Sequence, residues 1–190
     1  HRDLAWHTAR IAEMSVASTV LPDATDRRHA AWLVARGDDI LEDLSRLDTT
    51  LHDAGLPRLI IHGDYGLHNL VVRRLDQATP VDFELARLEW RLSDLASCLS
   101  KMRYAAGGYD FEGMRWFMSA YRAIYPIAAE EWRWFPDVLR HYRLMAAVQY
   151  WNSYFETSGP TRKLLSARDA LEQADWGRDH PREIAELNAS

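Results

Sequence analysis

The stretch that decides the fold reads Leu59-Ile60-Ile61-His62-Gly63-Asp64-Tyr65-Gly66-Leu67-His68-Asn69-Leu70-Val71-Val72. The apolar runs at its two ends are too short for helices and contain β-branched residues, so they predict two strands with a polar loop between them. A third apolar run, residues 80–83, predicts a strand beside the second, and residues 76–79 predict the hairpin turn. The sequence therefore predicts a small β-rich segment with polar side chains at its strand ends.

The rest of the chain is predicted to be helical, because its apolar residues recur at helical spacing. The expected helices cover residues 4–19, a long segment from a cap at Asp26 to Ala54, a segment from a cap at Ser93 to Gly107-Gly108, residues 111–124, and residues 137–156. Residues 137–156 are apolar on nearly every side and should be buried, whereas residues 161–174 and 181–188 are polar and should be more exposed. We expect a mainly helical α+β fold and a single domain over residues 1–190.

Composition and charge exclude several classes of protein. The 190 residues include 23 Lys and Arg against 28 Asp and Glu, a net charge of −5, which disfavours a general nucleic-acid binder. No apolar run approaches the ~18 residues of a membrane span, and the first residues do not resemble a secretory signal. The single cysteine, Cys98, excludes an internal disulfide and favours a reducing compartment. We expect a cytoplasmic protein without a nucleic-acid or membrane partner, and the sequence sets no oligomeric state.

Three polar residues of the β-rich segment could carry chemistry. Asp64 lies five residues before Asn69, and Asp82 follows thirteen residues later at the end of the third predicted strand. Polar side chains flanked by apolar strand residues are costly unless they are paired, and their oxygens suit Mg²⁺. Phosphoryl transfer to an alcohol needs a carboxylate beside the attacking hydroxyl and metal ligands that hold the triphosphate. The pattern Asp-x-x-x-x-Asn followed by Asp-Phe supplies both, as it does in protein kinases.

Three motifs, in their order and spacing, resemble the aminoglycoside phosphotransferase-like kinases, a family that includes choline and homoserine kinases. They are His62-Gly63-Asp64-x-x-x-x-Asn69, Val81-Asp82-Phe83-Glu84-x-Ala86 and Asp94-Leu95-Ala96. The resemblance implies a protein-kinase-like C-terminal lobe. It also implies transfer of the γ-phosphate of ATP or GTP, with Mg²⁺, to a hydroxyl of a small molecule such as an aminoglycoside, an amino alcohol or a sugar. The acceptor and the choice between ATP and GTP stay open.

The same resemblance assigns roles to individual residues. Asp64 is implied to be the catalytic base or the carboxylate that orients the hydroxyl. Asn69 and Asp82 are implied to hold the metal and, through it, the nucleotide. His62 is expected to pack beneath the catalytic loop. Asp94 is expected to accept hydrogen bonds from the loop backbone around residues 62–64.

Glu84 stands where protein kinases have glycine. An acidic residue there is common in the family that the chain resembles, and Glu84 is either a residue near metal or substrate or a surface acid. The sequence departs from the family pattern in two places. The loop has Gly66 and Leu67 where many members have histidine and proline, and its histidine is His68, whose role stays open. Residues 1–61 contain no glycine-rich phosphate loop and no lysine. We therefore expect the N-terminal nucleotide-binding lobe to be absent from this chain, and the isolated 190 residues could be inactive.

Two other classes of function compete with the kinase. A catalytically silent kinase-like lobe could act as a binding or regulatory module, although such a lobe has no chemical need for Asp64, Asn69 and Asp82. A metal-dependent hydrolase could use His62, Asp64, His68 and Asp82, although hydrolase sites usually gather more histidines. Metal preference separates the classes, since Mg²⁺ with nucleotide indicates the kinase and tight Zn²⁺ indicates the hydrolase.

Overall fold

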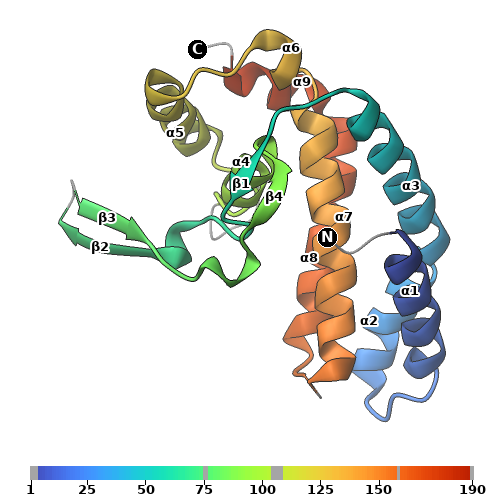
Figure 1. Ribbon diagram of the computed structural model, residues 1–190. Helices are drawn as coiled ribbons and strands as arrows, with labels where there is room; N and C mark the ends of the chain where they lie inside the picture. The colour runs from blue at the N-terminus through green and yellow to red at the C-terminus, as the bar shows by residue number, and fades with distance from the viewer. Residues whose placement is uncertain (1–3, 75–76, 104–108, 158, 189–190) are drawn as a thin grey trace. The chain divides into compact units, whose positions relative to one another are not determined.

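The computed structural model of the chain describes residues 4–74, 77–103, 109–157 and 159–188 (Figure 1). Its α-helices are α1 (Leu4–Ser18), α2 (Ala24–Val34), α3 (Gly37–Asp53), α4 (Leu92–Leu99), α5 (Phe111–Ile124), α6 (Ala129–Trp132), α7 (Phe135–Glu156), α8 (Arg162–Asp179) and α9 (Pro181–Ala185). Its strands are β1 (Arg58–Ile61), β2 (Leu70–Arg74), β3 (Gln77–Pro80) and β4 (Arg87–Trp90), and its 3₁₀ helices are η1 (Leu67–Asn69), η2 (Phe83–Leu85) and η3 (Glu186–Asn188). The described chain is mainly helical with small antiparallel sheets, as an α+β fold requires.

The chain divides into two compact units, of which the first comprises residues 1–53 and 140–176. Helices α1, α2 and α3 lie beside the parts of α7 and α8 that belong to this unit (Figure 1). Its core contains large apolar side chains with at most 1% exposure, each of which contributes about 1.5–3 kcal/mol by leaving water. They are Leu33, Ile40, Leu44, Leu47, Leu51, Leu144 and Trp151.

Buried basic groups of α7 are paired with acidic groups of α3 in this unit. Arg140 forms an ion pair with Asp43, and Nε2 of His141 lies 2.8 Å from Oδ1 of Asp48. Burial acts to raise the pKa of Asp43, but its hydrogen bond from Arg140 outweighs that effect and lowers the pKa below its ordinary value. The pairs satisfy charges that would be costly if buried alone.

The long helix predicted from Asp26 to Ala54 is wrong, because α2 and α3 are separate helices. Asp23 caps α2, with its Oδ1 accepting hydrogen bonds from the backbone N–H groups of Thr25 at 2.7 Å and Asp26 at 2.9 Å. Asp26 is instead a buried residue of the first turn, and it accepts a hydrogen bond from the Tyr154 hydroxyl at 2.6 Å. The apolar spacing continues across the break, so periodicity alone predicted one helix.

Among the other predicted helices, those over residues 4–19, 111–124 and 137–156 are confirmed as α1, α5 and α7. The helix that follows the β-rich segment ends at Leu99, and Ser93 lies buried inside it and does not cap it. Its predicted end, Gly107-Gly108, lies outside the described residues. The expectation that the last helices are exposed is wrong for one face of α8, which buries Leu164, Ala167, Ala170, Leu171 and Ala174.

The second unit comprises residues 54–139 and 177–190 and contains both sheets. β1 pairs with β4 and lies next to α4, whereas β2 and β3 form a hairpin that extends away from them (Figure 1). Ile61 and Trp90 are the buried ends of the β1–β4 pair, with 4% and 7% exposure. This pair fixes the point at which the chain leaves β1 and enters the polar loop.

The strand predictions need three corrections. The predicted third strand ends at Pro80, because Asp82 has a φ of 66° and η2 follows it. Residues 77–79, predicted as a turn, lie in β3, and Asp76 lies outside the described residues. β4 was not predicted. None of the described helices combines the length and the apolar character needed to cross a membrane.

Candidate active site

The loop between β1 and β2 turns sharply at Gly63, whose φ is 85°. A Cβ atom at this position would lie 2.2 Å from the carbonyl oxygen of Leu85. Both the left-handed backbone and the close approach of the η2 segment therefore require glycine. The loop closes at η1, where the Asn69 N–H donates to the Gly66 carbonyl at 3.0 Å. The result is a short loop, residues 62–69, packed against the segment that follows Asp82.

Asp94, in the first turn of α4, holds the start of this loop. Its Oδ2 accepts a hydrogen bond from the His62 N–H at 2.8 Å, and its Oδ1 accepts one from the Gly63 N–H at 2.9 Å. Hydrogen bonds from backbone donors to an ionised carboxylate are among the stronger ones in proteins. The predicted contact between Asp94 and the loop is therefore present, and its importance for activity stays a prediction.

His62 joins the end of β1 to the segment that carries Asp82. The side chain is buried, and Nε2 lies 2.8 Å from the carbonyl oxygen of Val81. A carbonyl only accepts, so Nε2 carries the proton and donates it. The imidazole also packs against the ring of Phe83, with 4.6 Å between ring centres. These contacts fix the Asp82 segment against the loop.

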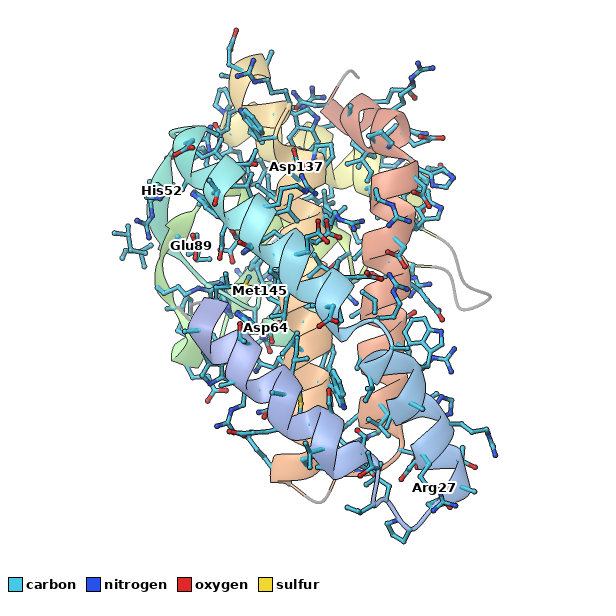
Figure 2. The ribbon with its side chains drawn as sticks, turned by 90° about the vertical axis from the view of Figure 1, so that its right-hand side faces the viewer. Arg27, His52, Asp64, Glu89, Asp137 and Met145 are labelled. Atoms are coloured by element: carbon cyan, nitrogen blue, oxygen red, sulfur yellow. The ribbon has the colours of Figure 1, made fainter. Side chains whose placement is uncertain are left out.

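Asp64, labelled in Figure 2, lies in the middle of the loop. It contacts the side chains of Lys101, His68 and Asn69. Its Oδ1 accepts a hydrogen bond from Nζ of Lys101 at 2.6 Å. Its Oδ2 lies 3.2 Å from Nε2 of His68 and accepts a hydrogen bond from Nδ2 of Asn69 at 3.2 Å. The Asp64 side chain is 36% exposed, so a small molecule can reach a carboxylate whose orientation is already fixed.

The charge of Asp64 follows from these contacts. Partial burial acts to raise its pKa, but hydrogen bonds from Lys101 and His68 and the positive charge of Lys101 outweigh that effect. The pKa of the Asp64 carboxyl is therefore lowered below its ordinary value, and the group is ionised at neutral pH. An ionised carboxylate accepts strong hydrogen bonds, so Asp64 is suited to orienting a hydroxyl group.

Asn69 and Asp82 lie on neighbouring strand ends. Nδ2 of Asn69 donates to the Asp64 carboxylate and, at 2.9 Å, to the Asp64 backbone carbonyl. The amide oxygen of Asn69 is therefore left for another partner. The Val81 N–H donates to the Asn69 carbonyl at 2.9 Å, and the exposed Asp82 follows directly. One amide oxygen and one carboxylate fit Mg²⁺, which binds few protein ligands and keeps waters or phosphate oxygens.

The other acidic candidate, Glu84, is exposed in η2. The described residues contain no group of three or more His, Cys, Asp or Glu side chains arranged to hold a metal ion. The Asp64 side chain thus contacts Asn69 and His68 directly. Asp82 is brought toward Asn69 by the backbone hydrogen bond between the preceding residue, Val81, and Asn69.

The prediction missed Lys101, which lies 37 positions from Asp64 in the sequence. It is one of only two lysines in the chain, the other being Lys163. Lys101 follows Asp94 by seven residues and Ser97 by four. Residues at these spacings lie on the same face of a helix. These spacings and the scarcity of lysine were the available signals, but neither belongs to a family motif.

Comparison with known proteins identifies the family of the chain. The sequence profile of the phosphotransferase enzyme family (APH) matches residues 3–142. The chain belongs to the phosphotransferase enzyme family. A homoserine kinase of Methylobacillus flagellatus is 28% identical over 152 residues, which cover 77% of this chain and 46% of that enzyme. The chain thus matches less than half the length of this relative.

The phosphotransferase family match includes the loop of residues 62–69, the Asp82 segment and α4. The resemblance inferred from the three motifs is therefore confirmed at the level of the family.

Proposed function

We propose that the protein transfers the γ-phosphoryl group of a nucleoside triphosphate to a hydroxyl group of a small molecule. Membership of the phosphotransferase family supports the reaction class. The observation that carries the proposal is Asp64, a partly exposed carboxylate of lowered pKa that Lys101, His68 and Asn69 hold in one orientation. We further propose that residues 1–190 form the C-terminal, kinase-like catalytic lobe of a phosphotransferase.

In this proposal Asp64 accepts a hydrogen bond from the acceptor hydroxyl and directs its oxygen toward the γ-phosphorus. The oxygen–phosphorus bond forms while the bond from the γ-phosphorus to the bridging oxygen breaks, and the nucleoside diphosphate leaves. The hydroxyl proton passes to the Asp64 carboxylate and then to solvent. Because the transition state of phosphoryl transfer is loose, the hydroxyl loses its proton late, and a weak base is sufficient.

The amide oxygen of Asn69 and the carboxylate of Asp82 are the proposed ligands of Mg²⁺. When bound, the ion supplies positive charge that offsets the charge of the triphosphate. His62 and Asp94 keep the loop in place beneath these ligands, through the contacts with Val81, the His62 N–H and the Gly63 N–H. Glu84 is proposed to lie near the metal or the acceptor.

We propose that nucleotide binding also needs a lobe that these residues do not supply. No glycine-rich phosphate loop and no lysine occurs in residues 1–61, and the match covers only 46% of the homoserine kinase. The nucleotide would then be ATP or GTP. The name of that relative makes homoserine, an amino alcohol with a carboxylate, the first acceptor to test, ahead of aminoglycosides and sugars.

The two alternatives have less support. A silent lobe gives no reason for the orientation of Asp64 beside Asn69. In a zinc hydrolase Nε2 of His62 could not be a metal ligand, because it donates to the Val81 carbonyl, and Nε2 of His68 is directed at Asp64. The described structure therefore favours the kinase.

The test is acceptor-dependent release of nucleoside diphosphate by the natural full-length protein. Homoserine, choline, kanamycin and glucose are each supplied with ATP or GTP and Mg²⁺, and phosphorylated product is identified by mass spectrometry. We expect one acceptor to give product, and we expect EDTA and Asp64→Asn to suppress it. Turnover that is unaffected by Asp64→Asn would refute the proposed role of the site, and tight Zn²⁺ binding with hydrolysis of the acceptor would indicate the hydrolase.

A further inference from the structure

We infer that Lys101 is a positioning residue for Asp64 in the reaction proposed above, on which this inference rests. Its Nζ lies 2.6 Å from Oδ1 of Asp64, the shortest of the side-chain contacts that Asp64 makes in the described structure. Lys101 belongs to none of the three motifs and comes from the turn after α4. The other two partners of Asp64, His68 and Asn69, both lie in η1. Lys101 therefore contacts the loop from a different part of the chain.

The ammonium group of Lys101 is itself held in place. Nζ lies 3.1 Å from Oγ of Ser97 and 3.4 Å from the carbonyl oxygen of Tyr65. Ser97 is fully buried, and its hydroxyl donates to the same Tyr65 carbonyl at 3.0 Å. An ammonium group has three donors, and each has a protein acceptor here. Lys101 is therefore arranged to hold Asp64 and the loop, and it has no donor left over for a phosphate.

The contacts of Asp64 also indicate which oxygen receives the acceptor hydroxyl. An ionised carboxylate offers about four acceptor positions, two on each oxygen. His68 and Asn69 take both positions on Oδ2, and Lys101 takes one on Oδ1. The remaining position is on Oδ1. Lys101 thus fixes the oxygen to which the hydroxyl donates its hydrogen bond and, late in the reaction, its proton.

Replacing Lys101 should lower turnover without weakening nucleotide binding. A small displacement of a catalytic group can reduce the rate roughly 10²-fold, and we expect kcat of Lys101→Met to fall by about that factor. KM for the magnesium nucleotide should change less than about threefold, because the three Nζ donors of Lys101 are directed at Asp64, Ser97 and Tyr65. Lys101→Arg, which keeps the charge with a different shape, should retain more activity than Lys101→Met. Lys163→Met is the matched control, since it removes the other lysine, which lies over the Tyr150 ring.

A double-mutant cycle with Asp64→Asn tests whether Lys101 acts through Asp64. If it does, Lys101→Met should reduce kcat by less than about threefold in the Asp64→Asn background, because the two losses are not additive. Independent, multiplicative effects would overturn the inference, as would a normal kcat in Lys101→Met or an increase in nucleotide KM alone. If Lys101→Met does not fold, Lys101→Arg takes its place in the same cycle.

A second measurement separates this inference from the proposed function. Crystal structures of the protein and of Lys101→Met show directly whether the Asp64 carboxylate keeps its orientation. We expect it to rotate away from the position in which its Oδ1 accepts the hydrogen bond from Lys101. An unchanged carboxylate would overturn the inference even if the enzyme is active. Absence of phosphoryl transfer to every acceptor would overturn the proposed function, and the structures would still decide whether Lys101 positions Asp64.

Discussion

Removing the carboxylate of Asp94 should destabilise the loop that carries Asp64. In Asp94→Ala the His62 and Gly63 N–H groups lose their acceptors, which lie at 2.8 and 2.9 Å. A hydrogen bond to a charged group contributes roughly 1.5–3 kcal/mol, and the partly exposed site favours the lower figure. Two such bonds give a loss of about 3 kcal/mol. Asp94→Asn keeps one acceptor and should lose roughly half as much.

Hydrogen exchange measured by NMR is the sharpest assay, because it reports on the two amides separately. A loss of about 3 kcal/mol corresponds to roughly 10²-fold faster exchange of the His62 and Gly63 amides if they open locally. Urea unfolding gives the global free energy for comparison. Asp110→Ala is the matched control, since that aspartate caps α5 with one hydrogen bond to Gly113 at 2.9 Å and should cost only ~1 kcal/mol.

The reasoning would be refuted by an Asp94→Ala protein in which both amides exchange at the original rate. It would also be refuted if Asp110→Ala accelerated exchange at residues 62 and 63 as strongly as Asp94→Ala does. Either result would mean that Asp94 does not hold the loop.

Three further predictions concern stability and reactivity. Gly63→Ala should destabilise the fold by at least ~2 kcal/mol in urea unfolding. Gly55→Ala should cost only ~1 kcal/mol, because Gly55 also has a positive φ but no atom lies within 4 Å of the added Cβ. Equal costs would contradict the close contact at residue 63. Asp43 has a lowered pKa, so its ionised form stabilises the fold above about pH 4, and this stabilisation is lost as the pH falls through the folded-state pKa. Asp43→Asn should therefore have a smaller free energy of unfolding than the original protein at pH 7. In urea titrations the difference in free energy between the two proteins should narrow below about pH 4. Burial raises the pKa of the Cys98 thiol to about 11, so Ellman's reagent at pH 8 should label the protein in urea but not in its native state; fast labelling of the native protein would contradict this.

The elements that sequence patterns predicted well are those whose own side chains determine them. α7 is buried along most of its length, as its apolar composition indicated, and α5 ends just before Pro126. The polar loop was predicted from the short apolar runs on either side. In each case the information lies within one segment of the chain.

The elements that were missed depend on distant contacts. In β4 the apolar residue is exposed and the charged residue is buried, since Leu88 is 54% exposed and Glu89 is 3% exposed. The order of apolar and polar residues therefore did not indicate a strand with one buried face. The break between α2 and α3 leaves the apolar spacing intact. Asp23 rather than Asp26 became the cap because Asp26 instead accepts the Tyr154 hydroxyl from α7. Such pairings follow from tertiary structure, which a local pattern does not contain.

The candidate site divides in the same way. The motifs identified Asp64, Asn69 and Asp94 because their spacing is fixed by the short loop and by the first turn of α4. Lys101 was not identified, because its pairing with Asp64 joins segments 37 residues apart. The pattern also left the role of His68 open, and the structure places its Nε2 3.2 Å from Oδ2 of Asp64.

The central claim is that Asp64 orients and deprotonates the acceptor hydroxyl, and steady-state kinetics of Asp64→Asn in the full-length protein test it most directly. Positioned acid–base groups contribute ~10²–10⁴-fold, and we predict a decrease of kcat in that range. KM for the magnesium nucleotide should stay close to its original value, since Asn69 and Asp82 are unchanged. An Asp64→Asn enzyme with near-normal kcat would contradict the account.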